Sequence, residues 1–287
     1  TYQVFQTAAN IGSFQKAADI LGLTPSAISH EISSMESELG FTVLTRSKSG
    51  VALTNYGEHL LPYVNAVLNS DESLQQAVAE LNGLKQGKVK IGVFSSVFTN
   101  WLPEILRSFQ KLYAKVTVEV FQGTYDDVYY WIKNGVADLG FLSVSSAKDI
   151  PIEPLYKDPL LCVLPKGTHR DSSKPYMDIE EMRAHQFVTQ RESTDADIQN
   201  FLKENSLRIQ SNYHVVDDLS TVALVEKGFG ICLMPELVMR DIPYEVDCYP
   251  VYPEASRIIV IAALHPEFMA PAVRTLYNHI LENYKVQ

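Results

Sequence analysis

Cysteine is scarce in this sequence. Only Cys162, Cys232 and Cys248 occur, and none has C-x-x-C spacing. Three cysteines cannot form a complete set of disulfides. Cys162 and Cys232 lie in the apolar runs LLCVL and GICLM, where we expect them to be buried as small hydrophobic residues. A redox switch is the alternative.

Long hydrophobic runs are also missing. Residues 258–264 (IIVIAAL) have the length of a strand and are far too short to cross a bilayer. No basic-then-apolar leader is present, so the sequence predicts a cytoplasmic protein without a membrane partner. The 287 residues suffice for two or three domains with their own cores. The numbering begins at Thr1 inside an apparent helix, and we expect a few residues to precede it.

Motifs for catalysis are absent as well. The sequence contains no G-x-S-x-G, Walker loop or G-x-G-x-x-G. His30 and Glu31 begin like H-E-x-x-H, but Ser34 stands where the second histidine is needed. The seven histidines show no i, i+3 or i+4 pairing, which disfavours a metal site. We therefore expect no enzyme, no catalytic residues, no metal and no cofactor.

Positive charge is in deficit, because 24 Lys and Arg face 34 Asp and Glu for a net charge of −10. This balance argues against a general nucleic-acid coat, although it permits a small DNA-reading module. Residues 16–32 (KAADILGLTPSAISHEI) have the pattern of such a module. Ser13 can cap a first helix that Gly22 ends, and Thr24 with Pro25 can begin a second.

The second helix has two contrasting faces. Ile28, Ile32, Met35 and Leu39 form an apolar face, and short polar residues lie opposite. This pattern is typical of a helix-turn-helix, whose second helix enters the major groove; a plain helical hairpin is the alternative. The pattern of residues 41–54 predicts a two-stranded wing, and the cations of this wing could lie over DNA phosphates. The candidate DNA-binding residues are Thr24, Pro25, Ser26, Ser29, His30, Ser33, Arg46 and Lys48.

These segments closely resemble the winged helix-turn-helix of LysR-type transcriptional regulators. The matching features are Ser13-Phe14, Ala17-Ala18, Ser29, residues 36–40 (ESELG), Arg46 and residues 53–57 (LTNYG). The resemblance is strongest in residues 1–60 and extends more loosely over the whole chain. One departure is charge: residues 1–60 hold three cations and five acids, whereas DNA-binding modules are usually basic.

A long helix is predicted from the cap at Thr54 to about residue 84, with a bend near Pro62. Its apolar residues follow three- and four-residue steps interrupted by Asp71, as in a short coiled coil. They are Leu60, Val64, Val67, Leu74, Val78 and Leu81. An amphipathic helix packed on its own chain is the alternative. The resemblance implies a homodimer through this helix, assembly into a homotetramer, and a hinge at residues 83–87.

From Lys88 onward strands and helices alternate, which predicts a mostly parallel sheet in two α/β lobes. The segments ADLGF, LLCVLP and GFGICLMPE also resemble the regulatory half of LysR-type proteins, which is similar to periplasmic solute-binding folds. The predicted fold class is therefore α/β, with a winged helix-turn-helix (1–57), a linker helix and hinge (58–87) and a two-lobed effector domain (88–287). The first lobe comprises about 88–164 and 262–287, and the second about 165–261.

Ligands of open α/β sheets bind beyond the carboxyl ends of strands. We expect Ser95, Ser96, Ser143, Gln190 and Arg191 to face one another across the cleft, at positions that match the family's effector site. Ordinary capping of strand ends is the alternative for each residue alone. A helix start at Ser96 and the forked donor of Arg191 favour a small organic anion.

The sequence thus predicts a LysR-type regulator that binds double-stranded promoter DNA under control of a small-molecule co-inducer between two lobes. RNA polymerase is a further candidate partner. The alternative function is a small-molecule-binding protein whose N-terminal helices serve only protein contacts.

Overall fold

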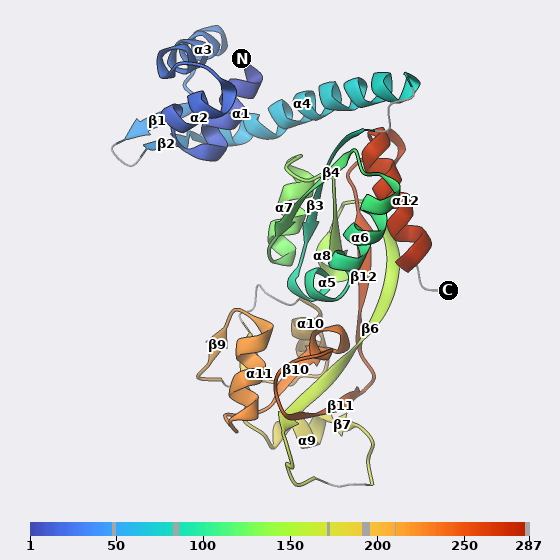
Figure 1. The fold of residues 1–287 in the computed structure, drawn as a ribbon. Coiled ribbons are helices and arrows are strands. Elements are labelled where there is room, and N and C mark those ends of the chain that lie inside the picture. The colour runs from blue at the N-terminus through green and yellow to red at the C-terminus, as the bar shows by residue number, and fades with distance from the viewer. Residues whose placement is uncertain (48–49, 83–85, 171–172, 191–195, 210, 285–287) are drawn as a thin grey trace. The chain divides into compact units, whose positions relative to one another are not determined.

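The computed structural model describes residues 1–287 except 48–49, 83–85, 171–172, 191–195, 210 and 285–287 (Figure 1). The chain divides into two compact units. One comprises Thr1–Leu84 with Lys133–Val136, and the other comprises Lys85–Ile132 with Ala137–Gln287.

The first unit begins with three short helices and a two-stranded wing. Its elements are α1 (Tyr2–Ile11), α2 (Phe14–Leu21), α3 (Pro25–Leu39), β1 (Leu44–Ser47) and β2 (Gly50–Leu53). As predicted, the Ser13 side chain caps α2, and Gly22 follows it at φ 65° in the left-handed region. The Thr24 hydroxyl accepts a hydrogen bond from the Ala27 N–H, with Pro25 in the first turn of α3. Local sequence therefore sets the two helix boundaries of the motif.

One apolar core holds this unit together. It joins Phe5 of α1, Ala18 of α2 and Ile28 and Ile32 of α3, all of which are buried. Leu39 is exposed and lies outside the apolar face that the sequence assigned to it. Its position at the last residue of α3 explains this, because the helix leaves the core there.

The long helix α4 (Asn55–Leu81) begins at the Thr54 cap and runs through Pro62. Its first turns pack on the helix-turn-helix through Leu61 and Val64. Gly57 permits this approach, since a Cβ there would lie 2.1 Å from the Val43 carbonyl oxygen. Val64 is thus a core residue of its own chain, and its assignment to the coiled-coil face was wrong. Residues 83–85 of the predicted hinge lie outside the described part of the chain.

The second unit contains two lobes. The first-lobe elements before the crossover are β3 (Gly87–Val93), α5 (Ser95–Asn100), α6 (Leu102–Leu112), β4 (Val116–Gln122), α7 (Tyr125–Lys133), β5 (Leu139–Ser143) and α8 (Val144–Ala147). The sequence placed Ser95 at the end of a strand, but β3 stops at Val93 and Ser95 begins a helix. Two helices, α5 and α6, follow this strand and meet at Trp101.

The second lobe lies between the long strands β6 and β12, and α12 returns to the first. The elements are β6 (Ile152–Pro165), β7 (Met177–Asp178), α9 (Ile179–Arg183), β8 (Thr189–Gln190), α10 (Ala196–Glu204), β9 (His214–Val215), α11 (Asp218–Glu226), β10 (Cys232–Pro235), η1 (Glu236–Met239), β11 (Val246–Tyr252), β12 (Ser256–Ala262), η2 (Pro266–Phe268) and α12 (Pro271–Tyr284). Cys162 and Cys232 are buried here, as predicted, and burial raises the pKa of both thiols.

The α/β class is confirmed, but the sheet is mixed instead of mostly parallel. Its strands follow the order β4-β3-β5-β12-β6-β11-β7, and β10 also pairs with β6. β3 is parallel to β4 and β5, whereas β12 is antiparallel to β5 and β6. β6 contributes Leu155 to the first lobe's core and Leu160 to the second's. The two strands that cross between the lobes therefore also tie their sheets together (Figure 1).

Candidate DNA-binding surface and inter-lobe cavity

The outer face of α3 carries most of the predicted DNA-binding residues. Ile28 and Ile32 point into the core, while Ser26, His30 and Ser33 are exposed and Ser29 is half-buried. The hydroxyls of Thr24 and Ser26 lie 2.9 Å apart at the start of the helix. The structure thus places these residues on one face of α3, and the N-terminal end of this helix is exposed.

The wing is joined to this face through one arginine. The Arg46 Nη2 donates a hydrogen bond to the Ser29 hydroxyl at 2.9 Å. The same guanidinium lies 4.5 Å from the centroid of the Phe14 ring, in cation–π geometry. Lys48 lies outside the described residues, so its position relative to Arg46 is not assigned.

Glu36 and Glu31, two acids of this module, accept hydrogen bonds from groups that are distant in its sequence. A Glu36 carboxylate oxygen accepts hydrogen bonds from the backbone N–H groups of Val43 and Leu44. The Glu31 carboxylate accepts from the Thr1 hydroxyl, which lowers the pKa of Glu31. Glu36 therefore connects α3 to the start of the wing, which gives the Glu of the ESELG motif a structural role.

The second site is a cavity of about 280 Å³ between the two lobes. Its wall from the first lobe comes from α5, the end of β4 and the start of α7, and its wall from the second comes from the start of α11. The lining residues are Phe94, Ser95, Ser96, Gln122, Gly123, Thr124, Tyr125, Asp127, Val216, Asp217, Asp218 and Arg257.

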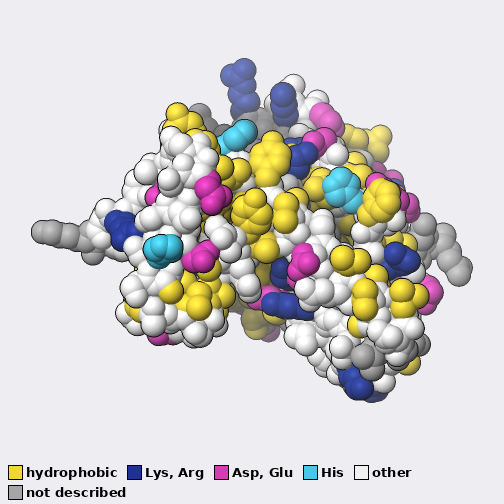
Figure 2. All heavy atoms as spheres, turned by 90° about the horizontal axis from the view of Figure 1, so that it is seen from above, with side chains coloured by type: hydrophobic (Ala, Val, Ile, Leu, Met, Phe, Trp, Pro, Cys, Tyr) yellow, Lys and Arg dark blue, Asp and Glu magenta, His cyan; other side chains and the backbone are white. Residues whose placement is uncertain are grey.

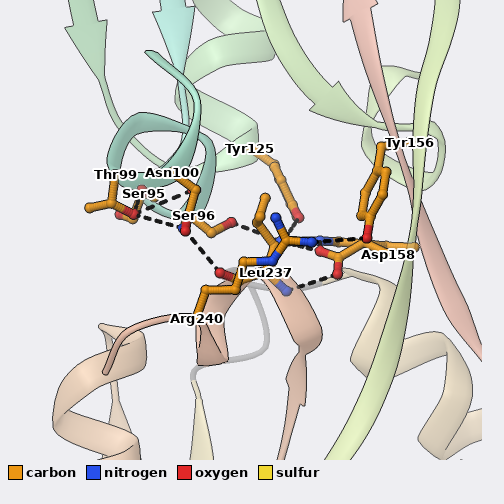
Figure 3. Close-up of polar contacts among 10 residues, drawn as sticks. Ser95, Ser96, Thr99, Asn100, Tyr125, Tyr156, Asp158, Leu237 and Arg240 are labelled. Atoms are coloured by element: carbon orange, nitrogen blue, oxygen red, sulfur yellow. Dashed lines mark hydrogen bonds and ion pairs between the residues drawn. The ribbon is translucent and has the colours of Figure 1, made fainter. Parts of the chain in front are cut away.

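A buried polar network lies at this cavity (Figure 3). Arg257 of β12 stands opposite Asp158 of β6, and its Nε and Nη2 contact one Asp158 carboxylate oxygen at 2.8 and 2.7 Å. Its Nη1 donates to the Tyr125 hydroxyl at 2.8 Å, and Nη2 donates to the Ser96 hydroxyl at 2.7 Å. The other Asp158 oxygen accepts from the Leu237 N–H at 2.9 Å.

This network connects both lobes to the crossing strands. Tyr125 and Ser96 belong to the first lobe, and Leu237 lies in η1 immediately after β10. The Asn100 side chain adds a further bond, because it donates to the Leu237 carbonyl at 3.0 Å. Sequence inspection missed Arg257 and Asp158; the available signal was the single charge of Arg257 in the apolar strand SRIIVIA.

The predicted effector residues are only partly brought together. Ser95 and Ser96 line the cavity. Ser143 is fully buried as the cap of α8 and does not occur among the lining residues. Gln190 ends β8, with its side chain outside the described structure, and Arg191 is likewise not described.

The charge of the described lining weighs against an organic anion. Asp127, Asp217 and Asp218 supply three carboxylates, and Arg257 is the cation that the described wall provides. Each nitrogen of that guanidinium already donates to Asp158, Tyr125 or Ser96. An incoming carboxylate would therefore meet negative charge without an uncommitted guanidinium to bind.

Two family models together match almost the whole chain. The model for the bacterial regulatory helix-turn-helix protein, lysR family, matches residues 1–58, and that for the LysR substrate binding domain matches residues 82–285. The chain belongs to the LysR family. It is therefore a DNA-binding transcriptional regulator with an effector-binding domain, as predicted, and the alternative of N-terminal helices serving only protein contacts is rejected.

A curated relative agrees with this assignment, and solved structures agree with the fold. A probable HTH-type transcriptional regulator, LrrA of Synechococcus elongatus, is 26% identical over 94% of this chain and 92% of its own length. A full-length OxyR variant from Pseudomonas aeruginosa superposes with a TM-score of 0.78 at 19% identity, covering 98% and 93% of the two chains. Full-length CbnR in complex with its target DNA gives a TM-score of 0.55 at 19% identity, covering 98% and 97%.

The relatives are transcriptional regulators, as expected for a LysR-type protein without catalytic motifs. In the part of this regulator that the structure describes, no helix is long and apolar enough to cross a membrane.

Proposed function

We propose that this LysR-type regulator reads promoter DNA with the exposed face of α3 and the β1–β2 wing, and responds to an effector in the inter-lobe cavity. The observation that supports the DNA surface best is the Arg46–Ser29 hydrogen bond, which joins wing and recognition helix. We propose Thr24, Pro25, Ser26, Ser29, His30, Ser33, Arg46 and Lys48 as its contact residues.

Physical chemistry supports different roles within this surface. Exposed hydroxyls and an imidazole on a helix that enters the major groove can reach base edges and phosphates. Ser29 accepts from Arg46, and its own O–H can still donate to a base. Arg46 is held by Phe14 and Ser29, so less side-chain freedom is lost when its charge meets a phosphate.

We further propose a division into a DNA-binding domain (1–57), a linker helix with hinge (58–87) and an effector domain (88–287).

A homodimer would form through the face of α4 that carries Tyr63, Val67, Leu74, Val78 and Leu81. Each of these side chains is half or more exposed, at steps of three, four and seven residues. Figure 2 shows hydrophobic side chains reaching the surface on the face that it draws. Because the regulator binds promoter DNA, we propose that it acts in the cytoplasm. We also propose that dimers assemble into a homotetramer and that RNA polymerase is a partner.

The effector would act by shifting the relative population of two lobe arrangements. The lobes are joined through β6, β12 and the Arg257–Asp158 pair, all of which border or approach the cavity. A ligand that contacts both walls favours the closed arrangement and changes how two linker helices present their wings. A coupling of about 1–3 kcal/mol is sufficient for such control.

DNA readout is tested by three alanine substitutions. Ser29→Ala and His30→Ala should relax sequence preference, since both lie where base edges are reached. Arg46→Ala should weaken binding nearly uniformly and reduce the salt slope of log K by about one unit, because one phosphate contact is lost. Fluorescence anisotropy on the DNA upstream of the protein's own gene, repeated at several salt concentrations, measures both effects.

Arg107→Ala provides the matched control. Arg107 is an exposed arginine on α6 that pairs with Glu104, so its loss changes net charge equally without touching the DNA-binding unit. A change in preference at one base pair with an unaltered salt slope would contradict the role given to Arg46. No binding of any upstream fragment by the unmodified chain would refute the proposed function itself.

A further inference from the structure

The inter-lobe cavity has carboxylates on both of its walls. Asp127 lies in the first turn of α7 in the first lobe. Asp217 and Asp218 lie at the cap and first position of α11 in the second lobe. All three line the same cavity of about 280 Å³, which places their negative charges on either side of one binding space.

Two of the helix N-termini at this cavity, those of α7 and α11, already hold a carboxylate of the chain. At the start of α7, an Asp127 oxygen accepts from the backbone N–H and hydroxyl of Thr124. At the start of α11, an Asp217 oxygen accepts from the Ser220 N–H. The N-termini of α7 and α11 at the cavity thus each have a carboxylate of the chain itself in the position that an anionic ligand would take.

The carboxylates of the wall are hydrogen-bond acceptors. The bonds above engage one oxygen of Asp127 and one of Asp217. Thr124, Ser95 and Gln122 add hydroxyl and amide groups, and each nitrogen of Arg257 is already hydrogen-bonded to Asp158, Tyr125 or Ser96. An ammonium group has three N–H donors and no acceptor, which matches such a wall.

A metal ion is a poorer match for these aspartates. Among the residues that the structure describes, no group of three or more histidine, cysteine or acidic side chains is arranged to hold a metal ion.

We propose that the effector is a small organic amine, as a cation or zwitterion, whose ammonium group is held by Asp127 on one side and Asp217 or Asp218 on the other. This inference rests on the proposed function, which makes the cavity the effector site. It also supplies a reason for closure, because a cation between the walls removes the repulsion between their carboxylates.

The test uses ligands that differ only in charge on one carbon skeleton. Putrescine, γ-aminobutyrate, succinate and butanediol form one such set, and benzylamine, benzoate and benzyl alcohol form a second. Each is titrated into the full chain by calorimetry, and each is also assayed for its effect on thermal unfolding. We expect binding by at least one amine-bearing member and none by its purely anionic counterpart.

Two conservative variants locate the binding amine. Asp127→Asn and Asp217→Asn remove charge with little change in size, and asparagine caps a helix about as well as aspartate. Each should weaken amine binding by roughly tenfold or more, since one charge-assisted hydrogen bond is lost. Asp126→Asn is the control: Asp126 neighbours Asp127 on α7, pairs with Lys148 and is not a lining residue.

The outcomes separate the effector class from the proposed function. Binding by succinate or benzoate without binding by the amines overturns the proposal, as does amine binding that both variants leave undiminished. A panel without any amine binder also contradicts it for ligands of this size. If the same samples bind upstream DNA by anisotropy in any of these cases, the regulator function stands and only the effector class fails.

Discussion

Replacing Arg257 by methionine should lower the free energy of unfolding of the effector domain by about 3–5 kcal/mol, because an uncompensated buried charge remains. Asp158 has no exposed surface, and Arg257 is only 3% exposed. Without the guanidinium, the described partner left for the Asp158 carboxylate is the Leu237 N–H. Urea unfolding followed by tryptophan fluorescence measures the loss, since Trp101 and Trp131 both belong to the first lobe.

Arg240→Met is the matched control for this prediction. Arg240 is close to the same network and donates to the Tyr156 hydroxyl at 3.2 Å, but that bond is exposed (Figure 3). Its loss should change stability by no more than about 0.5 kcal/mol. The double variant Arg257→Met with Asp158→Asn should cost less than the two single effects added together, because the charges interact. Additive effects, or a stable Arg257→Met variant, would show that the pair is not coupled as the distances indicate.

Introducing Val67→Asp together with Leu74→Asp should separate the proposed dimer into monomers. In the dimer these positions lie at the centre of the exposed α4 face, so four unpaired carboxylates would enter one apolar contact. Each buried unpaired charge costs several kcal/mol, and every 1.4 kcal/mol is tenfold in affinity. Dimer affinity should therefore fall by roughly a thousandfold or more. Sedimentation velocity at micromolar concentration measures the change in mass.

DNA affinity should fall with the dimer, because one wing and one recognition helix then bind alone. Ala66→Asp with Gln75→Glu is the control, since it adds the same charge on the flanks of the exposed face instead of its centre. The DNA-binding unit should remain folded in both variants, as neither Val67 nor Leu74 belongs to its buried core. An unchanged mass for Val67→Asp with Leu74→Asp would exclude this face as the dimer contact.

The departure of the DNA-binding module from a basic charge has a partial structural explanation. Glu36 binds the backbone at the start of the wing, and Glu31 binds Thr1. Arg46, in contrast, is presented beside Ser29 on the outer surface. The charge of the segment as a whole therefore describes the contact surface poorly, because an acid that serves an internal bond is counted equally with one that faces DNA.

Sequence was sufficient for the helix caps of the DNA-binding unit, which depend on neighbouring residues. The caps Ser13, Thr24 and Thr54 and the ends at Gly22 and Gly40 lie where their local chemistry predicts. Capping and the left-handed conformation are decided within a few residues, so they can be recognised without a fold. The family assignment followed from the same local motifs.

Tertiary structure decided what depends on residues that are far apart in the chain. Val64 is buried in the core of its own chain because α1 and the wing pack against α4. Arg257 meets Asp158, Tyr125 and Ser96 across separations of 99, 132 and 161 residues. Ser96, which the sequence predicted as part of an anion site, therefore already accepts a hydrogen bond from Arg257.

The charge of the cavity was decided in the same way. Asp127 and Asp217 each lie at the start of a helix. That they line one cavity follows from the sheet, which carries β6 and β12 through both lobes and brings α11 opposite α7. The sequence by itself determined the family, the helix-turn-helix and the two-lobed class, because these rest on local pattern; the preference for an ammonium ligand depends on charges that only the folded sheet places together.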